Sequence, residues 1–121
     1  MNPPPIAIGI FNAVLKERGY EVALFDSTLY PEEDGRSSDD AKQDLLQVAP
    51  FDFSDRGIEL RESDMVSDLL LKVKEFNPDI IFISILECTY ATANTMLRAL
   101  EGNSIPIIAG GVFPTFAEDY L

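Results

Sequence analysis

The 121-residue sequence contains no histidine, no tryptophan and a single cysteine, Cys88. Histidine is the commonest general base and the commonest nitrogen ligand for metals, so its absence excludes a self-contained histidine-dependent hydrolase, a zinc protease and a haem protein. One cysteine cannot form an internal disulfide, and no signal peptide precedes the first helix, so the composition indicates a reduced, cytoplasmic protein. No apolar run approaches the roughly 20 residues that a transmembrane helix needs.

Basic residues are also scarce, with 9 Lys+Arg against 21 Asp+Glu and a formal net charge of −12 at pH 7. This balance provides no electrostatic footprint for nucleic acid or for an anionic membrane surface. A chain of this length buries enough surface for one hydrophobic core, so we expect a single domain over residues 1–121. Residues 32–40 are acidic, small and polar, and we predict an irregular insertion over residues 31–62, with a short helix over 41–48.

Periodic apolar residues define the regular elements of the remaining chain. Helical spacing predicts three helices, over residues 5–18, 63–76 and 89–100. Ser63 is the expected cap of the second helix, and Asn77-Pro78 ends it. Strand composition predicts strands over residues 21–26, 79–85 and 104–111. The run over residues 79–85 is almost continuously apolar, which is typical of a central parallel strand that is covered on both faces.

The alternation of these elements predicts an α/β fold with a doubly wound parallel sheet. Three strands are recognisable, whereas a complete domain of this kind usually has five or more. We therefore expect the chain to be a fragment of a longer protein, truncated at both ends, with a first strand before Pro3 and a last strand after Leu121.

Open parallel sheets bind ligands beyond the carboxyl ends of their strands. Three segments follow the predicted strands: a loop that begins at Asp26, the run Ser84-Ile85-Leu86, and the pair Gly110-Gly111. Asp26 is interpreted as a loop-capping carboxylate, with ribose binding as the alternative. Ser84 either donates its hydroxyl to a phosphate or ring nitrogen or satisfies a neighbouring carbonyl. The two glycines either allow a ligand to approach the backbone closely or form a tight turn.

Residues 4–9, 13–22, 76–81 and 105–111, together with Pro114-Thr115, resemble the cobalamin-binding domain at the front of cobalamin-dependent radical-SAM enzymes. These enzymes include methyltransferases and proteins similar to the anaerobic magnesium-protoporphyrin IX monomethyl ester cyclase. The resemblance covers most of the chain. It implies a Rossmann-like, flavodoxin-like fold and a module that holds cobalamin.

In that family a Ser-x-Leu at one strand end and a Gly-Gly at the next hold the nucleotide tail of the cofactor. The resemblance therefore implies eight cofactor-binding residues: Ser84, Ile85, Leu86, Thr89, Gly110, Gly111, Val112 and Phe113. It also implies that Glu87 and Tyr90 lie near the corrin ring. The Asp-x-His-x-x-Gly motif that ligates cobalt in other cobalamin modules is absent, so the resemblance implies base-off cobalamin without a protein ligand on the lower face of cobalt.

The catalytic half of such an enzyme needs a Cys-x-x-x-Cys-x-x-Cys motif, because three thiolates hold the [4Fe–4S] cluster that cleaves S-adenosylmethionine. Cys88 alone cannot supply this motif and, next to a buried strand, is expected to be a small core residue. We therefore expect a non-catalytic chain with no metal-ligating residue of its own. Its implied partner is a radical-SAM domain downstream in the parent chain.

Two other hypotheses belong to different functional classes. The first is a cofactor-free interaction module of the same fold that docks onto a partner or forms a homodimer, because an exposed strand edge favours pairing between chains. The second is a phospho-receiver domain, which needs an aspartate where the sequence has Ser84. A flavin or nucleotide binder is disfavoured because no Gly-x-Gly-x-x-Gly follows a strand.

Overall fold

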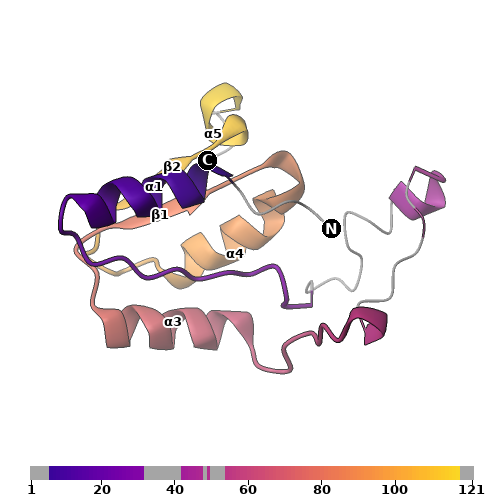
Figure 1. Cartoon of the computed structure of the whole chain (residues 1–121), viewed down its shortest axis with the longest axis horizontal. Helices are drawn as coiled ribbons and strands as arrows, with labels where there is room; N and C mark the ends of the chain where they lie inside the picture. The colour runs from indigo at the N-terminus through magenta and orange to yellow at the C-terminus, as the bar shows by residue number, and fades with distance from the viewer. Residues whose placement is uncertain (1–5, 32–41, 48, 50–53, 118–121) are drawn as a thin grey trace.

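The computed structural model describes residues 6–31, 42–47, 49 and 54–117 (Figure 1). Its elements follow one another in this order: helix α1 (Ile6–Glu17), the 3-10 turn η1 (Ser54–Arg56), helix α3 (Met65–Phe76), strand β1 (Ile81–Ser84), the 3-10 turn η2 (Glu87–Thr89), helix α4 (Tyr90–Ala99), strand β2 (Ile107–Gly110) and helix α5 (Val112–Phe116). The three predicted helices and two of the three predicted strands are confirmed. None of the helices among the described residues combines the length and the apolar character needed to span a bilayer.

Strands β1 and β2 form a two-stranded parallel sheet. Ile81 lies opposite Ile107, and the register continues to Ser84 opposite Gly110. Pro106 precedes β2, where its missing N–H interrupts no ladder, and its carbonyl accepts a hydrogen bond of 3.0 Å from the Ile81 N–H. The β1–α4–β2 unit confirms the predicted parallel α/β arrangement.

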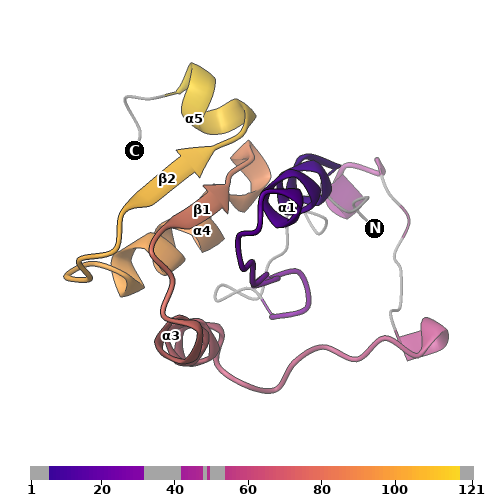
Figure 2. The same cartoon turned by 60° about the vertical axis from the view of Figure 1, so that its left-hand side comes forward.

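Helices surround this sheet (Figure 2). Helix α1 lies beside β1 on the side away from β2, where the rings of Phe11 and Phe82 stack with centroids 6.1 Å apart. Helix α4 packs against α3 and connects the two strands. The fully buried side chains are Ile85, directly after β1, and Leu100, directly after α4. The core of the described residues therefore lies between the sheet and α4.

The cap of α3 is Asp64, so the prediction of Ser63 was wrong by one residue. The Asp64 carboxylate accepts a hydrogen bond of 2.7 Å from the Ser67 N–H. The Ser63 hydroxyl instead donates to the carboxylate of Asp68, one turn into the helix. At its other end α3 stops at Asn77, which adopts a left-handed conformation with φ of 48°. The predicted Asn77-Pro78 stop is therefore confirmed.

The strand predicted over residues 21–26 is wrong. These residues form no strand, and they run between α1 and α3 in both Figure 1 and Figure 2. The end of this segment is anchored by Tyr30, which is buried and donates its hydroxyl to Asp68 at 2.7 Å. The Arg61 N–H donates to the Leu29 carbonyl at 2.8 Å. These contacts attach the segment to α3 rather than to the sheet.

The insertion predicted over residues 31–62 lies partly outside the described residues, which exclude 32–41, 48 and 50–53. Within the described part, residues 42–44 form one helical turn and Ser54–Arg56 form η1, whereas residues 58–62 are irregular. The described residues of this segment form only these short turns, and its status as an insertion stays a prediction. The helix predicted over residues 41–48 is represented by that single turn.

The predicted central position of β1 is not shown in the described part of the chain, and its coverage there is incomplete. There β2 is its only strand partner, and the Phe82 side chain remains 52% exposed despite its contact with α1. The apolar run over residues 79–85 did predict the strand itself. Whether the strand is covered, in contrast, depends on segments that are distant in sequence. Residues 21–26, which were predicted to form a further strand, instead pack toward α3.

Candidate functional site

Ser84 and Gly110 are neighbours at the carboxyl edge of the sheet, where the sequence predicts a ligand site. They are direct register partners on β1 and β2. The Ile85 N–H donates to the Gly110 carbonyl at 2.8 Å, which extends the ladder one residue beyond β1. Two segments separated by 25 residues therefore meet at one point, as the parallel arrangement requires.

The two glycines at this edge have different roles. A Cβ added at Gly110 would meet no atom within 4 Å, so this position opens onto free space. A Cβ added at Gly111 would lie 2.5 Å from the carbonyl oxygen of Ile85. Gly111 also has φ of 114° and ψ of −177°, a conformation that is essentially restricted to glycine. Gly111 is therefore required by the fold, whereas Gly110 leaves the backbone accessible.

The hydroxyl groups near the edge also differ in availability. The Thr89 hydroxyl accepts a hydrogen bond of 2.9 Å from the Leu86 N–H and donates to the Leu86 carbonyl at 3.2 Å. The Thr115 hydroxyl donates to the Gly111 carbonyl at 2.8 Å. The Ser84 side chain is exposed, and no described residue forms a hydrogen bond with its hydroxyl. Ser84 is therefore the hydroxyl at this edge that remains available to a ligand.

The other predicted site residues differ in how far their side chains are exposed. The Ile85 side chain is fully buried, so it belongs to the core and presents only backbone at the edge. Leu86 is 45% exposed and Val112 is 63% exposed. Phe113 is half-buried, and its ring packs against the Tyr90 ring with centroids 4.9 Å apart. This ring contact joins the segment after β1 to the segment after β2.

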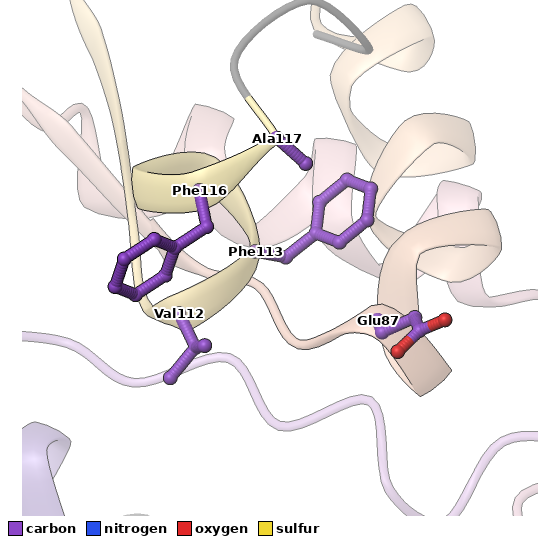
Figure 3. A pocket seen from close by; sticks show the side chains of 5 residues that line it. All are labelled: Glu87, Val112, Phe113, Phe116 and Ala117. Carbon is purple, nitrogen blue, oxygen red and sulfur yellow. The ribbon is translucent and has the colours of Figure 1, made fainter.

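A pocket of about 300 Å³ lies over α5 and η2 (Figure 3). The residues that line it are Glu87, Val112, Phe113, Phe116 and Ala117. Glu87 is the one charged member, and it comes from η2, whereas the apolar members come from α5 and the residue that follows it. The sequence analysis did not place Phe116 or Ala117 at the site. The helical spacing of Phe113 with Phe116 was the signal that pointed to a shared face.

Asp26 performs the loop-capping role that the sequence analysis favoured over ribose binding. Its carboxylate accepts hydrogen bonds from the Thr28 hydroxyl at 2.6 Å and from the Thr28 N–H at 2.9 Å. These two hydrogen bonds hold the pKa of the Asp26 carboxyl below its ordinary value. Because residues 21–26 form no strand, strand pairing does not bring Asp26 to the edge that Ser84 and Gly110 share.

Cys88 is exposed, so the prediction of a core residue was wrong. The chain turns into η2 at Glu87, two residues after the buried Ile85, and Cys88 lies within this exposed turn. Among the described residues, no group of three or more Cys, Asp or Glu side chains is arranged to hold a metal ion.

Comparison of the chain with protein-family models, with curated proteins and with solved structures gives no match.

Proposed function

We propose that this chain is the cobalamin-binding module of a radical-SAM enzyme of the methyltransferase or cyclase type. One observation carries the proposal: Ser84, with an available hydroxyl, lies directly beside Gly110, with open space above it, at the carboxyl edge of a parallel sheet. In the complete protein we propose a Rossmann-like, doubly wound sheet, a downstream radical-SAM domain and a cytoplasmic location.

The chemistry of the edge suits an uncharged macrocycle with a phosphate-linked tail. Residues 80–86 and 103–117 contain no charged side chain, and Glu87 is the one charged residue that lines the pocket over α5 and η2. Ser84 supplies a neutral hydroxyl donor for a phosphate oxygen or a ring nitrogen. The exposed side chains of Val112 and Phe116 supply apolar surface for a flat ring.

Each residue has a defined task in this proposal. Ser84 orients the tail through one hydrogen bond, and Gly110 allows the tail to approach the backbone. Thr89 acts indirectly, because its hydroxyl caps η2 and so positions the segment after β1. Cobalamin, when bound, supplies the cobalt centre for methyl transfer or radical chemistry. The chain contains no histidine, so no imidazole of this chain ligates cobalt.

The test is a titration with hydroxocobalamin, followed by desalting and a visible absorption spectrum. We expect the wild-type chain to retain the corrin absorption. Gly110→Val places a branched side chain in the open space, and we expect it to weaken binding at least about tenfold. Ser84→Ala removes one neutral hydrogen bond, and we expect it to weaken binding by a factor of about 2 to 12.

Ser104→Ala is the matched control because Ser104 is an exposed serine that precedes β2, at the opposite end of the sheet from Ser84. It should bind hydroxocobalamin like the wild type. Circular dichroism of every variant establishes that the fold is retained. A wild-type chain that elutes colourless, or a Gly110→Val variant that binds like the wild type, would refute the proposal.

A further inference from the structure

The pocket over α5 and η2 contains a single, isolated carboxylate. Glu87 is the only charged residue within residues 80–97 and 103–117, which include both strands, η2, α5 and most of α4. Its side chain is exposed, and in the described part of the chain no group bonds to its carboxylate. Figure 3 shows Glu87 on one side of the pocket and Val112 and Phe116 on the other. The carboxylate is therefore able to accept hydrogen bonds from a ligand that lies against the apolar side.

The position of Glu87 relative to α5 is set by contacts on either side of it. The Thr89 hydroxyl accepts a hydrogen bond of 2.9 Å from the Leu86 N–H and donates to the Leu86 carbonyl at 3.2 Å, which holds the turn that begins at Glu87. The Tyr90 ring, at the start of α4, packs against the Phe113 ring of α5 with centroids 4.9 Å apart. The charged and apolar sides of the pocket are therefore joined before a ligand binds.

We propose that Glu87 selects a corrinoid whose ring carries primary amides and excludes one that carries a free carboxylate at the same place. Cobalamin has primary amides around the rim of its ring, and an amide N–H donates to a carboxylate oxygen. Such a charge-assisted hydrogen bond is stronger than a neutral one, whereas two carboxylates repel each other. The inference rests on the proposed function, in which Val112 and Phe116 supply apolar surface for the ring.

The size and charge of the pocket agree with contact at the rim of the ring. Its volume of about 300 Å³ is at the lower end of the range for ligand pockets, so it accommodates one side of a macrocycle rather than the whole ring. No lysine or arginine within residues 80–97 and 103–117 offsets the negative charge of Glu87. A ligand group beside Glu87 is therefore favoured when it is a neutral donor and disfavoured when it is an anion.

The test compares hydroxocobalamin with its monocarboxylic derivatives, in each of which one propionamide of the ring is replaced by a carboxylate. Equilibrium dialysis against the full chain, read by the visible absorption of the corrin, gives the dissociation constant of each ligand. We expect the wild type to bind at least one derivative at least about tenfold more weakly than hydroxocobalamin, because that derivative places a like charge beside Glu87.

Glu87→Gln separates the charge of this side chain from its shape. The glutamine amide accepts a hydrogen bond from a ligand amide and also donates one to a ligand carboxylate. We expect this variant to bind hydroxocobalamin about 2 to 12 times more weakly than the wild type and to bind the excluded derivative more tightly. A damaged fold would weaken the binding of both ligands, so changes in opposite directions report the contact itself.

Glu101→Gln is the matched control, because it removes the same charge from an exposed residue beyond the end of α4 that lies away from η2. It should change the binding of hydroxocobalamin and of the derivative by the same factor. A loss of selectivity as large as that of Glu87→Gln would instead assign the selectivity to the net charge of −12 and overturn the inference.

Two further outcomes would overturn the inference and leave the proposed function in place. One is that the wild type binds hydroxocobalamin and every monocarboxylic derivative equally, and the other is that Glu87→Gln weakens the binding of both ligands alike. A wild-type chain that retains no hydroxocobalamin would refute the proposed function and this inference together.

Discussion

Replacement of Gly111 by alanine tests the assignment of this glycine to the fold. The backbone conformation at Gly111, with φ of 114° and ψ of −177°, destabilises a residue with a side chain by about 1–3 kcal/mol. The added Cβ would also lie 2.5 Å from the Ile85 carbonyl oxygen. That backbone must then shift, which weakens the 2.8 Å hydrogen bond from the Ile85 N–H to Gly110 by about 1 kcal/mol.

Together these effects predict that Gly111→Ala lowers the free energy of unfolding by about 2–4 kcal/mol. Urea denaturation followed by circular dichroism measures this change. Gly110→Ala is the matched control, since its Cβ meets no atom within 4 Å, and it should change the free energy of unfolding by less than about 1 kcal/mol. Equal effects of the two substitutions would refute the distinction between a structural glycine and an accessible one.

Two further predictions concern the core and the anchor of the segment after α1. Leu100 is 2% exposed and Leu46 is 93% exposed. We therefore expect Leu100→Ala to lower the free energy of unfolding, measured by urea denaturation, by about 2–5 kcal/mol. Leu46→Ala is the control and should leave the free energy of unfolding nearly unchanged. Hydrogen bonds from Ser63 and Tyr30 lower the pKa of the Asp68 carboxyl. The stability that these bonds confer is therefore present above about pH 4 and is lost as the pH falls through the folded-state pKa. As the pH is lowered from 6 to 2, the midpoint of urea denaturation should fall less steeply for Asp68→Asn than for the wild type. Equal slopes of midpoint against pH in the two proteins would contradict the role of Asp68.

The carboxyl edge of the sheet shows which features local sequence patterns can predict. The order of the elements places the ends of β1 and β2 at one edge of a parallel sheet, and Ser84 and Gly110 do pair there. Apolar spacing likewise identifies α1, α3 and α4. The stripe on α1 remains largely uncovered, with Ile6, Ile10 and Phe11 77%, 59% and 60% exposed. These features depend on residues that are close in sequence, together with the rule that successive parallel strands share an orientation.

Competition between contacts explains the predictions that failed. Ser63 and Asp64 are both good helix caps, and the choice falls on Asp64 because the Ser63 hydroxyl bonds to Asp68. Residues 21–26 have strand composition, but Tyr30 and Leu29 attach the end of this segment to Asp68 and Arg61. Each outcome depends on a distant side chain that no local pattern contains.

The amino-acid sequence alone determined the helices, the two parallel strands and the uncharged character of the edge, since these follow from composition and spacing along the chain. The tertiary structure decided which glycine is accessible, because only the approach of the Ile85 backbone distinguishes Gly111 from Gly110. It also decided that Ser84 keeps an available hydroxyl. Both outcomes depend on which groups meet in space, and contact between distant segments is a property of the folded chain.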